Sequence, residues 1–114
     1  MKLNLSKNEI QGPIPAEISE LKFLNFLMLQ NNRLSGELPQ SIDKLVSAEE
    51  ILLSNNNLKG SLPLNIGRLE KLRQLKVDGN RMTGSLPKDW KLQKIGKYCT
   101  NSAFQRLSAW QIFY

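Results

Sequence analysis

The sequence predicts a solenoid of stacked repeats rather than a domain folded around one central core. Asparagine recurs at an interval of 24 residues, as Asn8, Asn32, Asn56 and Asn80. A glycine follows each of them at a fixed spacing, as Gly12, Gly36, Gly60 and Gly84, and then a proline, as Pro15, Pro39, Pro63 and Pro87. A fixed period of this length is typical of solenoids, in which each repeat is one unit that stacks on its neighbours.

Each repeat is predicted to begin with a short strand. Leu27 and Leu29 are separated by one residue, so both side chains point to the same face of a strand, which we expect to be the core face. The same two columns recur along the chain, as Leu3, Leu27, Ile51 and Leu75 and as Leu5, Leu29, Leu53 and Val77.

The asparagine follows the strand, where the chain must turn. Its amide both donates and accepts hydrogen bonds, so it can pair with backbone groups that have left the strand ladder. We therefore expect a buried polar row along the solenoid, a structural ladder made of Asn8, Asn32, Asn56 and Asn80.

The rest of each repeat is predicted to be an extended or 3₁₀ segment on the outer side. Glycine provides backbone freedom, and proline fixes φ and removes a donor, which disfavours a regular helix. Apolar columns follow the proline and complete the predicted core, namely Ile18, Ile42, Ile66 and Trp90, then Leu21, Leu45 and Leu69, then Leu24, Ala48 and Leu72.

The string L-M-L-Q-N-N-R-L-S-G-E-L-P-Q-S-I-D-K-L, residues 27–45, resembles the plant-type leucine-rich repeat, with the pattern L-x-L-x-x-N-x-L-x-G-x-I-P-x-x-I-x-x-L. The resemblance implies an α/β repeat fold, a right-handed horseshoe segment with short parallel strands on the concave face and 3₁₀ or irregular convex segments. It also implies a non-enzymatic role in signalling or recognition. Family members typically form ectodomains of plant receptor-like kinases and receptor-like proteins, at the cell surface or outside the cell, and bind peptides, proteins or small hormones.

Four repeats are predicted within residues 1–92, spanning 3–26, 27–50, 51–74 and an incomplete 75–92. After Trp90 the apolar columns shift by one residue, to Leu92 and Ile95, which predicts a degenerate fifth repeat in 93–114 with a strand formed by Ile95, Tyr98 and Thr100. The spacing of Leu107, Trp110 and Tyr114 favours an amphipathic capping helix, and out-of-frame sequence that never packs is the alternative. Cys99 has no partner for a disulfide within the chain.

The beginning of the chain differs from such ectodomains, which start with a signal peptide and a cysteine-containing cap. Met1 lies two residues before Leu3, and no secretory signal precedes it. No apolar stretch approaches the length of a transmembrane helix. We therefore expect a fragment or a shortened relative of a longer protein, and its compartment stays open. We also expect the acceptor sequence for N-glycosylation, Asn4-Leu5-Ser6, to remain unmodified.

An uncovered first repeat predicts low stability or self-association. Half-exposing five or six apolar side chains forfeits on the order of 5 kcal/mol, comparable with the stability of a whole domain. A monomer with a cooperative thermal transition above about 65 °C would contradict this expectation.

Charge and composition argue against catalysis and nucleic-acid binding. The chain has no histidine and one cysteine, and we expect no cofactor or metal. Residues 1–50 hold five basic and seven acidic side chains, whereas 51–114 hold eleven basic and three acidic. The basic set could attract an anionic partner, but we favour a solvated outer face because no nucleic-acid-binding motif accompanies it. Nine of these eleven residues crowd positions 68–97, namely Arg68, Lys71, Arg73, Lys76, Arg81, Lys88, Lys91, Lys94 and Lys97.

Function is therefore assigned to the variable positions of the strands, which the solenoid exposes. Phe26, Met28 and Leu52 would place apolar side chains next to one another, bordered by Glu50 and Lys76, where a protein, peptide or co-receptor could dock. The alternative is a sheet that merely tolerates apolar residues, in a structural fragment or an intracellular scaffold. The predicted contact set is Phe26, Met28, Gln30, Glu50, Leu52, Ser54, Gln74, Lys76 and Asp78.

Overall fold

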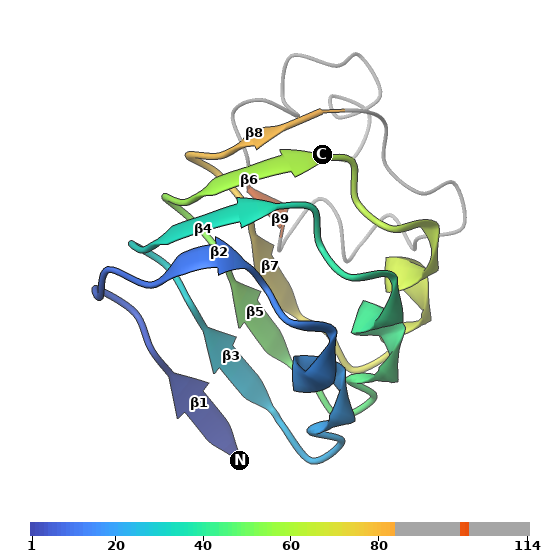
Figure 1. Cartoon of the computed structure of the whole chain (residues 1–114). Helices are drawn as coiled ribbons and strands as arrows, with labels where there is room; N and C mark the ends of the chain where they lie inside the picture. Colours follow the sequence, from blue (N-terminus) through green and yellow to red (C-terminus); the bar gives the residue numbers. More distant parts are fainter. Residues whose placement is uncertain (84–98, 101–114) are drawn as a thin grey trace.

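Two parallel sheets and a row of 3₁₀ turns form the solenoid (Figure 1). The computed structural model describes residues 1–83 and 99–100. The first sheet has the order β1-β3-β5-β7-β9, with β1 (Lys2–Asn4), β3 (Phe26–Met28), β5 (Glu50–Leu52), β7 (Gln74–Lys76) and β9 (Cys99–Thr100). The second has the order β2-β4-β6-β8, with β2 (Gln11–Pro13), β4 (Arg33–Gly36), β6 (Asn57–Gly60) and β8 (Arg81–Met82).

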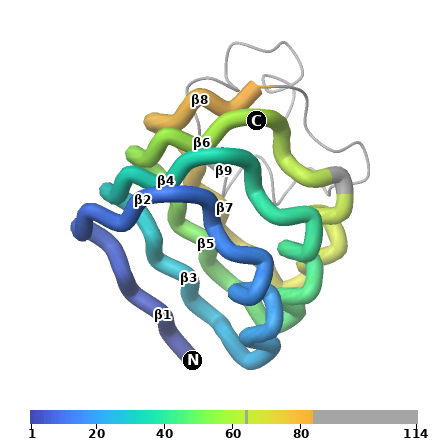
Figure 2. The backbone as a smooth tube through the Cα atoms, viewed as in Figure 1, coloured from blue at the N-terminus to red at the C-terminus, as the bar shows by residue number. Residues whose placement is uncertain are grey.

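Three 3₁₀ turns complete the described repeats and lie on the side opposite the first sheet (Figure 2). They are η1 (Ala16–Glu20), η2 (Gln40–Lys44) and η3 (Leu64–Arg68). Each turn begins directly after a proline in an extended conformation, with ψ between 139° and 141°. The predicted outer 3₁₀ segments are thus present, and proline ends the preceding extended stretch because it cannot donate a ladder hydrogen bond.

The two sheets stack the repeats with different offsets. The first sheet pairs residues one full period apart, such as Leu3 with Leu27 and Leu27 with Ile51. The second sheet pairs Gly12 with Leu34 and Ser35 with Asn57, which are 22 residues apart in each case. In the second sheet, each residue therefore pairs with one that lies two positions short of its equivalent in the next repeat.

The core is one continuous column of leucine and isoleucine between the sheets and the turns. The strand residues Leu27, Ile51 and Leu75 are each 1% exposed, and Leu45 and Leu69 after the turns are fully buried. The first repeat differs, because Leu3, Ile10, Ile18 and Leu21 are only partly buried and Leu5 is 39% exposed. Stacking on a neighbour at both faces is what buries a repeat, and the described first repeat is covered on one face only.

Two features differ from the sequence-based predictions. The second sheet was not predicted, since the stretch after each asparagine read as irregular.

The fifth strand exists as β9, but the predicted shift of its columns by one residue is wrong. Leu75 pairs with Cys99 and Lys76 with Thr100, so the strand keeps the interval of 24 residues. Trp90 and the predicted capping helix lie outside the described residues.

Candidate partner-binding surface

The variable positions of the first sheet form two columns on its outer face, which we call the concave face. One column holds Lys2, Phe26, Glu50 and Gln74, and the other holds Asn4, Met28, Leu52 and Lys76. Residues two apart on a strand point to the same side, and neighbouring strands lie about 4.8 Å apart. The parallel register therefore brings all these side chains onto one surface.

Three apolar residues occupy neighbouring positions in the middle of the concave face. Met28 on β3 is paired with Leu52 on β5, and Phe26 lies two residues before Met28 on the same strand. All three are partly buried, unlike Leu27 and Ile51 on the opposite side of the same strands, which are each 1% exposed. The structure therefore brings Phe26, Met28 and Leu52 together, and we call them the apolar cluster.

Charged residues border the apolar cluster, and most of them are already paired. The Arg73 guanidinium lies 3.1 Å from the Glu50 carboxylate and 3.7 Å from that of Glu49. Lys76, which follows Leu52 in its column, has no ion pair within the described residues. Exposed pairs of this kind are worth at most about 1 kcal/mol, so Arg73 fixes the position of Glu50 more than it stabilises the fold.

The third predicted column, Gln30, Ser54 and Asp78, is less accessible than expected. Ser54 is only 9% exposed, and its hydroxyl donates a 2.5 Å hydrogen bond to the Asp78 carboxylate in the next repeat. Ser54 therefore holds the Asp78 carboxylate in place. The prediction that Ser54 is exposed on the concave face is wrong. The Oε1 of Gln30 is buried and has no hydrogen-bond partner among the described residues.

The asparagine ladder is present and joins successive repeats. The Asn32 amide donates to the Leu29 carbonyl at 3.0 Å and to the Leu5 carbonyl of the preceding repeat at 2.9 Å. Its oxygen accepts from the backbone N–H groups of Asn8 and Ile10. Asn56 and Asn80 repeat this pattern, whereas Asn8 is exposed at the end of the row. The ladder is structural, because its side-chain amides hydrogen-bond to backbone groups.

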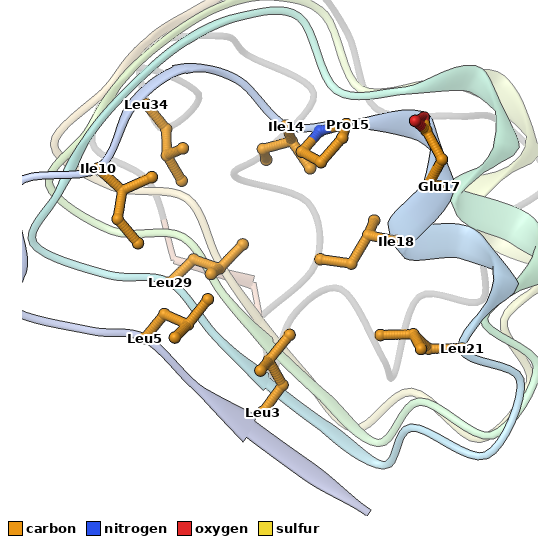
Figure 3. Close-up of a pocket in the computed structure, with 10 residues that line it drawn as sticks. All are labelled: Leu3, Leu5, Ile10, Ile14, Pro15, Glu17, Ile18, Leu21, Leu29 and Leu34. Atoms are coloured by element: carbon orange, nitrogen blue, oxygen red, sulfur yellow. The ribbon is translucent and has the colours of Figure 1, made fainter.

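A second surface lies at the N-terminal end of the core, where the first repeat is open (Figure 3). A cavity of about 390 Å³ is lined by Leu3, Leu5, Ile10, Ile14, Pro15, Glu17, Ile18, Leu21, Leu29 and Leu34. We call it the open end. Figure 3 shows Leu3 of β1, Ile18 of η1, and Leu5 and Leu29 from the segments just after β1 and β3 pointing into the same space. Its lining is apolar except for Glu17.

The basic residues of the second half do not form one patch in the described part of the chain. They are spread over the end of η3 (Arg68), the turn before β7 (Lys71 and Arg73), β7 itself (Lys76) and β8 (Arg81). Arg68 lies 3.4 Å from the Asp43 carboxylate of the preceding repeat. The four lysines between positions 88 and 97 lie outside the described residues.

Residues 1–83 and 99–100 contain neither a cluster of metal ligands nor a membrane-spanning helix. No group of three or more histidine, cysteine, aspartate or glutamate side chains is placed to hold a metal ion there. None of the helices in this part has the length and apolar character needed to cross a bilayer.

Comparison with protein families gives the identity of the repeats. A family model described as Leucine Rich Repeat matches residues 1–21, 23–45 and 47–69, more than half of the chain. The chain belongs to the leucine-rich repeat family. The 24-residue period, the strand pairing of Leu27 with Ile51 and the asparagine ladder are therefore features of a leucine-rich repeat solenoid. No curated protein matches the chain.

Solved structures of plant receptor ectodomains share this fold. The leucine-rich repeat ectodomain of the plant membrane receptor kinase GASSHO1/SCHENGEN3 from Arabidopsis thaliana, in complex with CASPARIAN STRIP INTEGRITY FACTOR 2, matches with 31% identity and a TM-score of 0.74, over 86% of this chain and 12% of that chain. The BIR2 ectodomain from the same organism matches with 28% identity and a TM-score of 0.75, over 93% and 57%. The BIR3–SERK2 complex, also from Arabidopsis thaliana, matches with 32% identity and a TM-score of 0.74, over 86% and 53%. The leucine-rich repeat chain thus spans from about an eighth to just over half of these structures.

Proposed function

We propose that this chain is a non-enzymatic binding module of the cell surface or extracellular space, and that its apolar cluster contacts a peptide or a protein. Two of the similar structures are complexes, one with CASPARIAN STRIP INTEGRITY FACTOR 2 and one between BIR3 and SERK2. The observation that carries the proposal for this chain is the juxtaposition of Phe26, Met28 and Leu52 on an outer sheet face.

The apolar cluster has the properties of a docking site. Stability of the fold favours apolar residues only on the core side of these strands, where Leu27, Ile51 and Leu53 are at most 1% exposed. Burying the outer side chains would contribute about 25 cal/mol for each Å² of apolar surface covered. Large apolar side chains held on a rigid sheet lose little conformational entropy on binding, which is typical of interface hot spots.

Polar groups beside the apolar cluster favour a partner with hydrogen-bond donors and a carboxylate. The unpaired oxygen of Gln30 is a buried acceptor, and leaving such a group unsatisfied costs about 1–3 kcal/mol. A partner that brings a donor to the Gln30 Oε1 would satisfy this acceptor. Lys76 has no ion pair within the described residues and suits a carboxylate on the partner.

The test uses a phage-displayed library of linear peptides selected against the chain. We expect the double variant Phe26→Ser/Met28→Ser to bind the selected peptides about tenfold or more weakly, because two hot-spot side chains are removed. The matched control is Phe23→Ser, since Phe23 is 81% exposed and lies in the turn after η1. Unchanged affinity in the double variant would show that the peptides bind elsewhere and that the concave face merely tolerates apolar residues.

We infer a second contact at the open end, where a second copy of the chain packs against the apolar lining. The open end is an apolar depression beside the edge strand β1, and both its side chains and the free strand edge favour association. Two copies related by a two-fold axis would cover each other's lining, so the contact is closed and produces dimers rather than fibres.

Sedimentation equilibrium over a range of chain concentrations tests the second contact. We expect the 114-residue chain to dimerise reversibly and the Leu5→Lys variant to remain monomeric, because Leu5 lines the open end and its substitution adds a charge there. Val46→Lys is the control, since Val46 is 58% exposed and does not line the open end. A chain that is monomeric at all concentrations would contradict this contact, but it would not contradict the proposed binding at the apolar cluster.

A further inference from the structure

We propose that Asn4 is an acceptor site for an N-linked oligosaccharide, whose glycan covers the N-terminal edge of the concave face. Asn4-Leu5-Ser6 matches the acceptor sequence N-x-S/T. The inference rests on the extracellular placement in the proposed function, since the modification takes place in the secretory pathway. It replaces the expectation that this sequence stays unmodified.

The side-chain geometry of the acceptor sequence leaves the reactive nitrogen free. The Asn4 Oδ1 accepts hydrogen bonds from the Ser6 hydroxyl at 2.6 Å and from the Ser6 backbone N–H at 3.1 Å. The Asn4 Nδ2 makes no hydrogen bond to the described residues, and Asn4 is exposed in the edge strand β1. The hydroxyl that the acceptor sequence requires therefore already contacts the amide that would be modified.

Most other asparagines of the described chain would have to give up a hydrogen bond from Nδ2 to carry a glycan. Seven of them use Nδ2 to donate to the neighbouring backbone or to another side chain, namely Asn8, Asn25, Asn32, Asn55, Asn56, Asn65 and Asn80. Asn31 and Asn57 do not donate through Nδ2 to any described residue, but neither begins an N-x-S/T sequence. Asn4 alone combines the acceptor sequence with a free and exposed amide nitrogen in this part of the chain.

The modification is a transfer from a lipid-pyrophosphate-linked oligosaccharide. The Asn4 Nδ2 forms a bond to C1 of the first sugar, the bond between C1 and the pyrophosphate oxygen breaks, the amide loses one proton, and the lipid pyrophosphate leaves. Neither oxidant nor reductant is needed. The product keeps the Asn4 Oδ1, so both hydrogen bonds from Ser6 are compatible with the glycosylated side chain.

The position of Asn4 determines what the glycan covers. Asn4 is paired with Met28 across β1 and β3, so the glycan would begin next to the apolar cluster. Leu3 and Leu5 point to the other side of the strand and line the open end, which the glycan would leave uncovered. A partner would then be confined to the outer faces of β3, β5 and β7.

The test is translation of the full chain behind a cleavable secretory leader in the presence of microsomes. Only chains protected from added protease are scored, which selects those that entered the lumen. We expect one slower-migrating species that peptide N-glycosidase converts back to the unmodified mobility. The variants Asn4→Gln and Ser6→Ala should abolish this species, while Ser6→Thr keeps the hydroxyl and should retain it. Asn31→Gln, at an asparagine outside the acceptor sequence, should also retain it.

Protected chains that all lack the glycan would overturn the inference, as would a glycan that persists in Asn4→Gln. Glycosylation is measured by mobility, whereas the proposed function is measured by peptide affinity. A glycosylated chain that binds no peptide through Phe26 and Met28 contradicts only the proposed function. An unglycosylated chain whose peptide binding depends on these two residues contradicts only the assignment of Asn4.

Discussion

A single asparagine side chain satisfies backbone groups in two successive repeats. Asn56 donates to the Leu53 carbonyl in its own repeat at 3.1 Å and to the Leu29 carbonyl of the preceding repeat at 3.0 Å. Its oxygen accepts from the Leu34 N–H at 3.0 Å. The two carbonyls lie just after β3 and β5, where the chain leaves the strand, and buried backbone groups at such places need a partner. The Leu34 N–H lies within β4 and donates to the Asn56 side chain. An amide is the one neutral side chain that supplies two donors and an acceptor there.

The variant Asn56→Asp tests this role without a change of volume. A carboxylate keeps the acceptor for Leu34 but cannot donate to the Leu29 and Leu53 carbonyls, and it places a negative charge beside both oxygens. We expect the free energy of unfolding to fall by about 2–6 kcal/mol, from two unsatisfied carbonyls at about 1–3 kcal/mol each. Urea denaturation measures this change.

Asn57→Asp is the matched control for the same experiment. Asn57 is exposed in β6, and its side chain makes no hydrogen bond to the described residues. A change of less than about 0.5 kcal/mol is expected there, as for most surface substitutions. Equal losses in the two variants would mean that added charge, and not the ladder, accounts for the effect.

Individual residues show what sequence reasoning could predict and where it failed. The role of Asn32 was predictable, because a repeated amide after a strand has few other uses. The apolar cluster was predictable from the repeat interval, since parallel stacking places Met28 beside Leu52. The burial of Ser54 was not, because it depends on a hydrogen bond to Asp78 in the next repeat. Nothing in the pattern of one repeat distinguishes a serine that bonds to its neighbour from one that faces solvent.

The second sheet is the element that sequence reasoning missed. β4 ends at Gly36, with φ of +74°, a conformation that favours glycine, and β2 ends at Pro13. Both residue types are depleted in strands, so the pattern indicated an irregular segment. Pairing occurs nevertheless because each strand is short and is aligned by its neighbours in the stack, as in Gly36 with Leu58. Interactions between repeats therefore override local propensity here.

The 3₁₀ turns depend on one isoleucine each, and this gives a prediction at the scale of the element. Ile66 in η3 is fully buried, whereas Ile18 in η1 is only partly buried beside the open end. We expect Ile66→Ala to lower the free energy of unfolding by about 2–5 kcal/mol, as for other buried isoleucines. Ile18→Ala should cost about half as much or less, since part of its side chain is already in contact with solvent.

The two isoleucines are their own control, since they hold the same place in the first and third repeats and receive the same substitution. Denaturant titration of both variants gives the comparison. If both substitutions cost the same, the first repeat would be as well covered in solution as the third.

At the scale of the whole molecule, we expect stability to differ among the described repeats, because the first repeat is less buried than the second and third. The amides of Leu5, Leu29 and Leu53 occupy equivalent positions and donate hydrogen bonds of 2.9, 2.9 and 2.8 Å to the next repeat. Their side chains are 39%, 4% and 0% exposed. Local opening costs less where fewer apolar contacts are lost, so exchange should begin at the first repeat.

Amide hydrogen exchange at low chain concentration measures this gradient. We expect the Leu5 amide to exchange about tenfold or more faster than the Leu29 amide, which corresponds to a difference of about 1.4 kcal/mol in opening free energy. Raising the chain concentration should slow exchange at Leu5 if the open end is covered by a second copy. Equal protection at both positions would contradict the uneven stability.

The asparagine ladder has a direction, and this makes the solenoid extendable. Asn32, Asn56 and Asn80 each reach back to the preceding repeat, as Asn80 does to the Leu53 carbonyl and the Leu58 N–H. The Asn8 Nδ2 donates only to carbonyls of its own repeat, those of Leu5 and Ser6. The Asn8 Oδ1 has no hydrogen-bond partner among the described residues. A duplicated 24-residue unit would therefore bring its own ladder asparagine, which can bond to the preceding repeat, and backbone groups to which the asparagine of the following repeat can bond. Chains of this kind can lengthen or shorten during evolution by whole units, without inventing a new interface.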